Sequence, residues 1–307
     1  MNGLIECIPN VSEGRDLNVI NELADLVKNA KGVMLLDYSN DVDHNRSVYT
    51  IVANIDIMEE VMFKFIKRAS ELIDLNHHQG IHPRMGAVDV CPFVCLDKTL
   101  LVDVISMSKR LAKNVAEELS IPTYLYEYSS INPYHKNLAD LRKGEFEGLA
   151  KKQLDSKWTP DFGKGYNKTA GVCAIGVRKP LIAYNVILDS NNLQLAKNIA
   201  SIIREKNGGF KSVKALGLML TSINKAQVSM NLCNYLDTGV MEVFNAIKSL
   251  AKKENVDILY SELIGLMPKE ATLDIDFEEI KLKDFDLNKQ VIEYRIKSLE
   301  EGKNEFW

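Results

Sequence analysis

Apolar side chains recur along this chain in two rhythms, one typical of strands and the other typical of amphipathic helices. Runs that alternate apolar and polar residues, or that are rich in β-branched and aromatic residues, predict strands. Apolar positions three and four residues apart predict helices. The first helical series is Leu17, Ile20, Leu23, Ala24 and Val27. Asp16 stands just before it as a typical N-cap residue, and Gly32 ends the predicted helix.

The predicted elements follow one another in the same order in both halves of the chain. The first half has predicted strands at 3–9, 33–37, 46–54, 87–94 and 123–128, and helices at 17–31, 58–73 and 103–119. A polar loop is predicted at 39–45, a charged helix at 137–154 and a glycine-rich connection at 158–166. The second half has predicted strands at 172–177, 181–188, 213–220, 226–232 and 257–262, and helices at 193–205, 240–253 and 284–300.

This repeated order predicts an α/β (α+β) fold with two similar subdomains, residues 1–170 and 171–307. Each subdomain is expected to be a mixed sheet of about five or six strands with helices on one face. The sheet face without helices needs a cover in each subdomain, and the other subdomain is the simplest one. A cleft or tunnel between two such subdomains is a common place for a ligand.

Composition and charge exclude several classes of protein. The 307 residues are 46% hydrophobic and 26% charged, as in ordinary soluble globular proteins. The net charge of −4 gives no reason to expect a nucleic-acid or membrane partner. No apolar run approaches the roughly 18 residues that span a bilayer, and no basic region precedes Glu6, so a cytoplasmic location is expected. The five cysteines lie in apolar runs and are expected to be buried, reduced thiols: Cys7, Cys91, Cys95, Cys173 and Cys233.

The densest group of candidate catalytic residues is the segment 74–94, between a predicted helix and a predicted strand. It holds three of the five histidines, His77, His78 and His82. Interruptions by glycine and proline predict a loop with fixed bends, and Pro83 restricts His82 to extended backbone. An imidazole has an ordinary pKa of about 6.5, so one that is held on a stiff loop suits proton transfer near neutral pH.

Two other interpretations of these histidines stay open. His82 could be an ordinary hydrogen-bonded loop histidine. On a continuous helix His78 and His82 would share one face, as zinc ligands often do. Gly80 and Pro83 interrupt such a helix, and no CxxC or HExxH motif accompanies the histidines, so a metal is not expected.

Charged residues near predicted strand ends are further candidates. Asp37 ends one predicted strand and Arg46 opens the next, so they could orient an imidazole or bind a substrate carboxylate. The intervening Asp41, Asp43 and His44 fit a solvated turn equally well.

Two later segments could also bind an anionic ligand. Arg84 could hold a carboxylate bidentately, or it could pair with Asp89 or Asp37 in a structural role. Segment 162–171 combines glycines, lysines and an aromatic ring, which suit a flat anionic ligand, although most glycine-rich linkers bind nothing. Arg178 opens a basic turn that is equally well explained as an exposed hairpin.

At these residues the sequence closely resembles the glutamate formimidoyltransferase family, the folate enzyme of histidine breakdown. The motifs stand in the family's order from residue 3 to about residue 272: GLIECIPNVSEGR, LLDYSNDVDHNRSVYT, HHQGIHPRMGAVDVCPF, IPTYLYEY, LADLRKGEFEGL, WTPDFG, AQVSMNL and SELIGLMPKEA. The resemblance implies two α/β subdomains with a folate tunnel between them, and a homodimer. It covers the transferase part only, so the cyclodeaminase that is fused to some members is expected to be a separate protein.

The resemblance also implies a reaction and a set of site residues. The reaction transfers the formimidoyl group from N-formimidoyl-L-glutamate to the cosubstrate tetrahydrofolate, giving 5-formimidoyltetrahydrofolate and L-glutamate, and no metal is required. The catalytic histidine falls on His82. Some relatives carry an aspartate where Ser39 stands, so an auxiliary carboxylate is expected at Asp37 or Asp41. The folate segment falls on about Gly163–Val172, where this chain is about one residue shorter and richer in lysine than the family pattern. The expected substrate-binding residues are Asn10, Arg46, Arg84, Phe162, Gly163, Lys164, Gly165, Tyr166, Gly171, Val172 and Arg178.

Alternative functions remain compatible with the sequence. A related folate enzyme could move a formyl group, as a glutamate formyltransferase or in the cyclisation of 5-formyltetrahydrofolate. An imine donor and a carbonyl donor differ only by an N–H group in place of an oxygen. A non-catalytic folate-binding protein is a second alternative, and the intact loop around His82 argues against it. A metallohydrolase would carry bound zinc.

Overall fold

The boundary between the two units of the chain lies after Arg178. A computed structural model describes residues 3–304, and contacts within it separate a first unit that ends at Arg178 from a second that begins at Lys179. The predicted boundary after residue 170 is therefore too early. Strand β7 (Cys173–Val177) was assigned to the second half by its place in the repeat, but it pairs in parallel with β5 (Val88–Cys95) and β6 (Thr123–Glu127). It thereby completes the first sheet.

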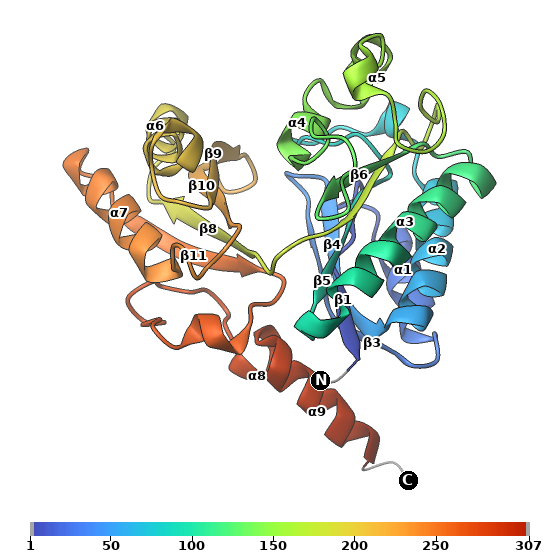
Figure 1. Ribbon diagram of the computed structural model, residues 1–307. Coiled ribbons are helices and arrows are strands. Elements are labelled where there is room, and N and C mark those ends of the chain that lie inside the picture. The colour runs from blue at the N-terminus through green and yellow to red at the C-terminus, as the bar shows by residue number, and fades with distance from the viewer. Residues whose placement is uncertain (1–2, 305–307) are drawn as a thin grey trace. The chain divides into compact units, whose positions relative to one another are not determined.

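The first unit is a seven-stranded mixed sheet with three long helices on one face (Figure 1). Its remaining strands are β1 (Leu4–Cys7), β2 (Asn10–Val11), β3 (Val33–Asp41) and β4 (Arg46–Asn54). β1 and β2 run between β4 and β5, β3 lies outside β4, and β7 and β6 extend the opposite edge. The helices are α1 (Leu17–Lys28), α2 (Ile55–Leu72) and α3 (Leu101–Glu118), and their apolar faces form one core with the sheet.

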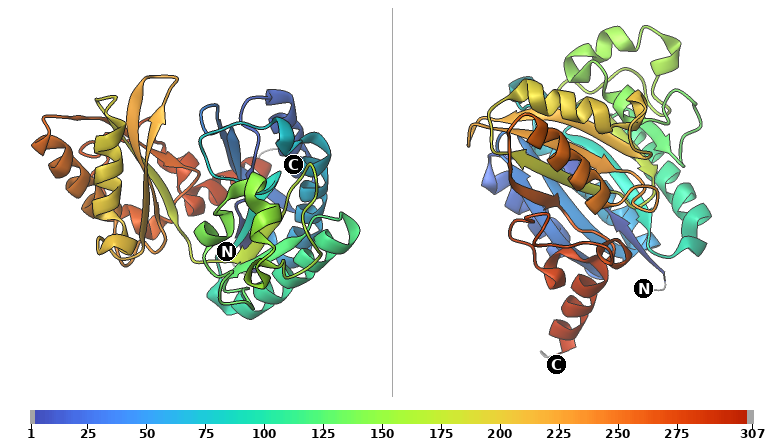
Figure 2. Two further views of the ribbon diagram at one scale, coloured as in Figure 1. Left: turned by 90° about the horizontal axis from the view of Figure 1, so that it is seen from above. Right: turned by 90° about the vertical axis from the view of Figure 1, so that its left-hand side faces the viewer.

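The second unit is a four-stranded sheet with two helices on one face (Figure 2). Its elements are β8 (Ile182–Leu188), α6 (Leu193–Ile203), β9 (Val213–Leu220), β10 (Lys225–Leu232), α7 (Val240–Lys253) and β11 (Ile258–Ile264). The strand order β11-β8-β10-β9 matches β5-β1-β4-β3 of the first unit, and both units follow the split β-α-β-β-α-β plan. The predicted α/β fold of two similar subdomains is thus confirmed. The second sheet has four strands and is antiparallel throughout, instead of mixed with five or six strands, because the predicted strand 172–177 is β7 of the first sheet.

Three predicted elements differ in extent. β3 continues to Asp41 because its last residues pair with the start of β4, so the predicted loop 39–45 shrinks to a tight hairpin turn. The predicted helix 137–154 is two helices, α4 (Leu138–Arg142) and α5 (Glu145–Lys152), separated at Gly144, whose φ of +93° is left-handed. The C-terminal helix is divided into α8 (Leu287–Gln290) and α9 (Ile292–Asn304).

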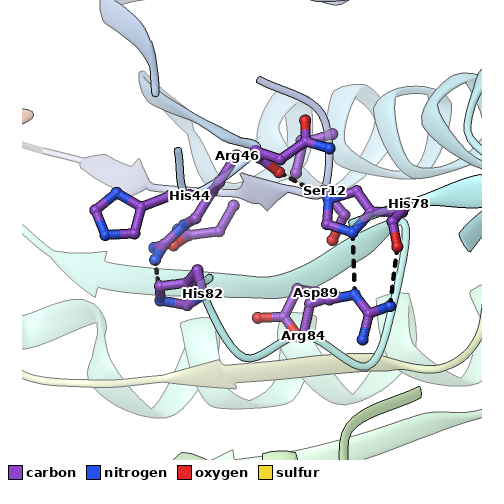
Figure 3. Close-up of a pocket in the computed structure, with 10 residues that line it drawn as sticks. Ser12, His44, Arg46, His78, His82, Arg84 and Asp89 are labelled. Atoms are coloured by element: carbon purple, nitrogen blue, oxygen red, sulfur yellow. Dashed lines mark hydrogen bonds between the residues drawn. The ribbon is translucent and has the colours of Figure 1, made fainter. Parts of the chain in front are cut away.

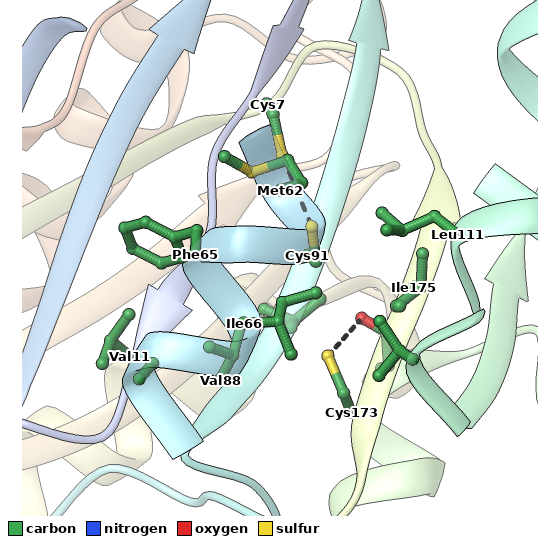
Figure 4. Close-up of a cluster of buried hydrophobic side chains, with 14 of the residues drawn as sticks. Cys7, Val11, Met62, Phe65, Ile66, Val88, Cys91, Leu111, Cys173 and Ile175 are labelled. Atoms are coloured by element: carbon green, nitrogen blue, oxygen red, sulfur yellow. Dashed lines mark hydrogen bonds between the residues drawn. The ribbon is translucent and has the colours of Figure 1, made fainter. Parts of the chain in front are cut away.

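The cysteines of the first core act as small apolar side chains. Cys7 and Cys91 lie under α2 with their Sγ atoms 3.5 Å apart, beside Met62 (Figure 4). Burial raises the pKa of the Cys91 and Cys173 thiols well above the ordinary value, which disfavours the reactive thiolate. All five cysteines are free thiols, but Cys95 and Cys233 are only half-buried, so the expectation of full burial is wrong for these two.

The helices give no sign of a membrane span. Among the residues that the structure describes, no helix is both long enough and apolar enough to cross a bilayer.

Candidate active site

A small polar cavity opens where the β3–β4 hairpin turn, the end of β2 and the histidine loop meet (Figure 3). Its volume is about 10 Å³, which is near the lower limit for one water molecule. The lining residues come from strands and loops that are far apart in sequence: Asn10, Val11, Ser12, His44, Asn45, Arg46, His78, His82, Arg84 and Asp89. Four of the predicted site residues, Asn10, Arg46, His82 and Arg84, are therefore brought together.

Two hydrogen bonds hold the histidine loop to the hairpin turn. The Ile81 amide donates to the Asp43 carbonyl at 3.2 Å, and the Asn45 side-chain amide donates to the Gln79 carbonyl at 3.0 Å. The turn and the loop approach so closely at Gly80 that an added Cβ would lie 2.3 Å from the His44 carbonyl oxygen. Glycine is required here for contact, and the contact fixes where His82 stands.

A second pair of glycines joins the histidine loop to the segment before β7. An added Cβ on Gly86 would lie 1.9 Å from the Val172 carbonyl oxygen, and one on Gly171 would lie 2.2 Å from that of Met85. The Val172 amide donates to the Met85 carbonyl at 3.0 Å. Gly171 and Val172 thus support the histidine loop, and Val172 is fully buried.

His82 is half-buried, and its Nε2 atom is hydrogen-bonded to Arg46. Arg46 Nη1 donates to His82 Nε2 (Figure 3). Because a guanidinium can only donate, Nε2 carries the lone pair and the imidazole is neutral. Burial lowers the pKa of His82 well below its usual range, and the nearby Arg46, Arg142 and His44 lower it further. The structure thus holds a neutral base whose lone pair is occupied.

Arg46 has a lowered pKa and a buried Nε atom that makes no hydrogen bond within the described residues. Burial lowers its pKa to about 9, with a further contribution from Arg142, while Asp89 and Asp41 oppose the shift. Its Nε atom is buried and has no hydrogen-bond partner within the described part of the chain. A buried guanidinium without a carboxylate pair is costly, and such a group suits an anionic ligand.

His44 forms a second candidate acid–base pair with Asp41, one of the two positions where an auxiliary carboxylate was expected. His44 Nδ1 lies 3.0 Å from Asp41 Oδ2, and the His44 amide donates to Asp41 Oδ1 at 2.8 Å. The His44 ring stands edge-on to His82 with the ring centroids 6.1 Å apart. The i, i+3 spacing of an acid and a histidine in a turn was the signal available for this pair.

Arg84 lines the cavity, but its donors are used by the protein. Nη1 and Nη2 donate to Glu147 at 2.8 and 2.6 Å, and Nη1 also donates to Glu145 at 3.1 Å. Nε donates to His78 Nδ1 at 3.0 Å. The start of α5 brings these two glutamates to the loop, and the suggested partner Asp89 pairs with Arg142 instead.

His78 and His77 have different surroundings from His82. His78 Nε2 lies 2.8 Å from the Asn45 carbonyl, so it donates there while Nδ1 accepts from Arg84. Both ring nitrogens are thus used, and His78 bridges the loop and the turn in its neutral form, consistent with a pKa that burial lowers. The His77 side chain is 86% exposed and does not line the cavity.

Asp89 and Arg142 form a buried ion pair that sequence reasoning missed. Arg142 Nε donates to Asp89 Oδ2 at 2.8 Å, and its Nη2 lies 2.5 Å from the same oxygen. Asp89 Oδ1 accepts from the Met85 amide at 2.8 Å. Asp89 points into the cavity because β2 and β5 change register around it, with Asn10 opposite Val90 and Val11 opposite Val88.

The remaining predicted residues lie elsewhere. Lys164, Gly165 and Tyr166 line a second cavity of about 330 Å³ together with the side chains of α5 and its end, including Leu154. Phe162 and Gly163 pack against β6 and Pro122, respectively. Asp37 on β3 and Arg178 after β7 do not line either cavity, so their roles stay predictions.

No group of three or more histidine, cysteine or acidic side chains that could hold a metal ion occurs among the described residues. The two histidines that were considered as zinc ligands do not share a helix face. One of them, His78, has no ring nitrogen left for a metal.

Comparisons with known proteins assign the two units to one family. Residues 4–178 match the formiminotransferase domain, N-terminal subdomain, and residues 183–277 match the formiminotransferase domain. The two-unit α/β fold is thus that of a transferase family. The chain belongs to the formiminotransferase family.

Named relatives cover nearly the whole chain. A glutamate formimidoyltransferase of Streptococcus pyogenes serotype M1 is 45% identical over 294 residues, which are 95% of this chain and 98% of that protein. The one from Thermoplasma acidophilum is 40% identical over 92% of this chain and 94% of its own length. The formimidoyltransferase-cyclodeaminase of Mus musculus is 37% identical over 89% of this chain, which spans only 52% of that protein.

Proposed function

We propose that this protein is a glutamate formimidoyltransferase that moves the formimidoyl group of N-formimidoyl-L-glutamate to tetrahydrofolate. The observation that supports the proposal most directly is the neutral His82 beside Arg46, whose Nε is buried without a partner in the described residues, in a chain that is 45% identical to a protein of that name. The site offers a base for an amine nucleophile and a cation for a carboxylate donor. The family resemblance further supports a homodimer, a role in histidine breakdown and a cyclodeaminase as the next enzyme.

Proton transfer in this reaction needs one group that first accepts and then donates. N5 of tetrahydrofolate attacks the formimidoyl carbon and forms a bond to it, and N5 then loses its proton to His82 Nε2. His82 returns the proton to the glutamate nitrogen, whose bond to carbon breaks as L-glutamate leaves. A positioned acid–base group of this kind contributes about 10²- to 10⁴-fold to the rate. The pair of His44 and Asp41 stands beside His82, with the two imidazole rings 6.1 Å apart, as a second acid–base group of the site.

Charge recognition of the donor is assigned to Arg46 rather than to Arg84. The donor carries two carboxylates, and a guanidinium with an unused buried donor is the stronger candidate. Arg84 already makes hydrogen bonds to two glutamates and to His78. Arg84 is therefore proposed to support the loop that carries His82.

Tetrahydrofolate is proposed to contact the segment Gly163–Val172. Tyr166 and Lys164 line a cavity whose volume of about 330 Å³ falls in the range of small-molecule sites. The other end of the same segment, at Gly171 and Val172, is bonded to the histidine loop. One segment thus connects the larger cavity with the catalytic loop. The folate tunnel between the two units remains an expectation from the resemblance.

The test is a turnover assay with tetrahydrofolate, comparing N-formimidoyl-L-glutamate and N-formyl-L-glutamate as donors. Wild-type protein is expected to turn over the formimidoyl donor, and His82→Ala is expected to lose at least about 100-fold in kcat. His77→Ala is the matched control and is expected to keep wild-type turnover because its side chain is exposed. Turnover of the formyl donor alone would favour the formyl-transfer alternative. Folate binding with no turnover of either donor would favour a cyclising or non-catalytic protein.

A further inference from the structure

The lone pair that His82 needs for catalysis is occupied in the structure. Arg46 Nη1 donates to His82 Nε2, and no proton can be accepted there while this bond exists. The cavity around the two side chains has a volume of about 10 Å³, which is near the lower limit for one water molecule. A side chain must move before the reaction begins.

Arg46 is the side chain whose own contacts favour such a move. The two acids that attract it are engaged with other groups: Asp89 accepts from Arg142 and from the Met85 amide, and Asp41 accepts from His44. Arg46 Nε has no partner in the described part of the chain. Its hydrogen bond to His82 joins a cation to a neutral ring, and a carboxylate is a stronger acceptor for a guanidinium than an imidazole is.

We propose that a carboxylate of the bound donor draws Arg46 away from His82, so that His82 becomes available as a base only when the donor is in place. This inference rests on the proposed function. Arg46 moves from a bond with a neutral imidazole to a charge-assisted bond with a carboxylate, and His82 Nε2 is left exposed to the reacting nitrogen. Arg46 then acts as a positioning residue that couples donor binding to the state of the base.

The coupling has a consequence for His82 itself. The titratable and charged groups that face His82 are Arg46 from β4, His44 from the hairpin turn and Arg142 from α4. All three disfavour its protonated form. A donor carboxylate neutralises Arg46 and also removes its hydrogen bond to Nε2. The pKa of His82 should therefore rise when the donor site is occupied, which moves the base toward the pH at which it exchanges protons most effectively.

Histidine NMR of protein labelled with 15N in its imidazole rings tests the coupling without turnover. The probe is the reaction product L-glutamate, which carries the same carboxylates, with potassium chloride at equal ionic strength as the control for screening. In wild-type protein, L-glutamate is expected to raise the pKa of His82 and to shift its Nε2 signal. In Arg46→Met, the pKa of His82 is expected to be raised already, and L-glutamate should no longer change it.

Kinetics of the same variants separate positioning from general structural damage. Arg46→Met is expected to raise the KM for the donor by roughly 30- to 100-fold, as the loss of a charged hydrogen bond implies, and to move the acidic limb of the pH profile toward neutral pH. Arg46→Lys is expected to bring the KM for the donor part of the way back to the wild-type value. Arg110→Met, on the exposed side of α3, is the matched control and should change neither the KM nor the pH profile.

The possible results distinguish this inference from the proposed function. One result is that the wild-type protein is active, but tens of millimolar L-glutamate changes neither the pKa nor the Nε2 signal of His82. The coupling is then wrong, whether or not L-glutamate binds, and the function stands. If L-glutamate shifts His82 in wild type and not in Arg46→Met while no donor is turned over, the coupling stands and the proposed reaction is wrong.

Discussion

The buried pair of Asp89 and Arg142 gives a quantitative prediction about the stability of the first unit. The side chain of Asp89 is 4% exposed and that of Arg142 is 15% exposed, so solvent screens their interaction weakly. Asp89→Asn keeps the shape and the acceptor for the Met85 amide, but it removes the only carboxylate that Arg142 contacts in the described part of the chain. Leaving one partner of a buried pair uncompensated typically costs about 3–5 kcal/mol.

The environment of the pair supports the upper part of that range. Arg46 and Arg142 repel each other, and Asp89 attracts Arg46 as well as Arg142. The variant therefore leaves two arginines near each other with less negative charge. In Asp89→Asn with Arg142→Met, the uncompensated cation is gone, so the double variant should be more stable than Asp89→Asn alone.

Urea unfolding followed by the fluorescence of one tryptophan measures this free energy. The chain has two tryptophans, and Trp307→Phe leaves Trp158, which lies in the first unit. A probe in one unit avoids averaging two transitions in a two-unit chain. Glu60→Gln on α2, which breaks an exposed pair with Lys64, is the matched control and should leave the midpoint unchanged. A cost below about 1 kcal/mol for Asp89→Asn, or no recovery in the double variant, would refute the reasoning.

Three further predictions concern the loop, the pH dependence and the core. Gly171→Ala should lower the free energy of unfolding by about 1–3 kcal/mol and impair turnover, because its Cβ would meet the Met85 carbonyl. Gly148→Ala, in open space on α5, is the control and should be neutral or stabilising in the same urea assay. Burial lowers the folded-state pKa of His82, so this residue's contribution to stability is present above about pH 6.5 and is lost as the pH falls below it. The unfolding free energy of His82→Gln should consequently fall less than that of wild type between pH 7.5 and pH 5.5. Tyr49→Phe removes a buried hydrogen bond of 3.0 Å to the Ile20 carbonyl and should cost about 1 kcal/mol, as judged by the shift of the urea midpoint.

Sequence patterns were sufficient for the elements and their repeated order because these depend on neighbouring residues. The series from Leu17 to Val27 and the N-cap at Asp16 correspond to α1, where the Asp16 side chain accepts from the Asn18 amide. Pro83 after His82 was enough to predict an extended loop histidine. The family motif HHQGIHPRMGAVDVCPF indicated the same histidine loop. The strand order of each sheet and the boundary at Arg178 could not be read in this way, because β7 has the same apolar pattern whichever sheet it joins.

The partners of the charged side chains were decided by tertiary structure alone. Arg46 and His82 are 36 residues apart, and Asp89 and Arg142 are 53 residues apart, so no periodic pattern connects them. Arg84 was expected to bind substrate, but its guanidinium donates to Glu145 and Glu147 at the start of α5, just after the break at Gly144. The sequence by itself determined the two α/β subdomains and the histidine loop. Only the fold decided that Arg46 is hydrogen-bonded to His82, because the pairing of buried polar groups depends on distances that folding creates.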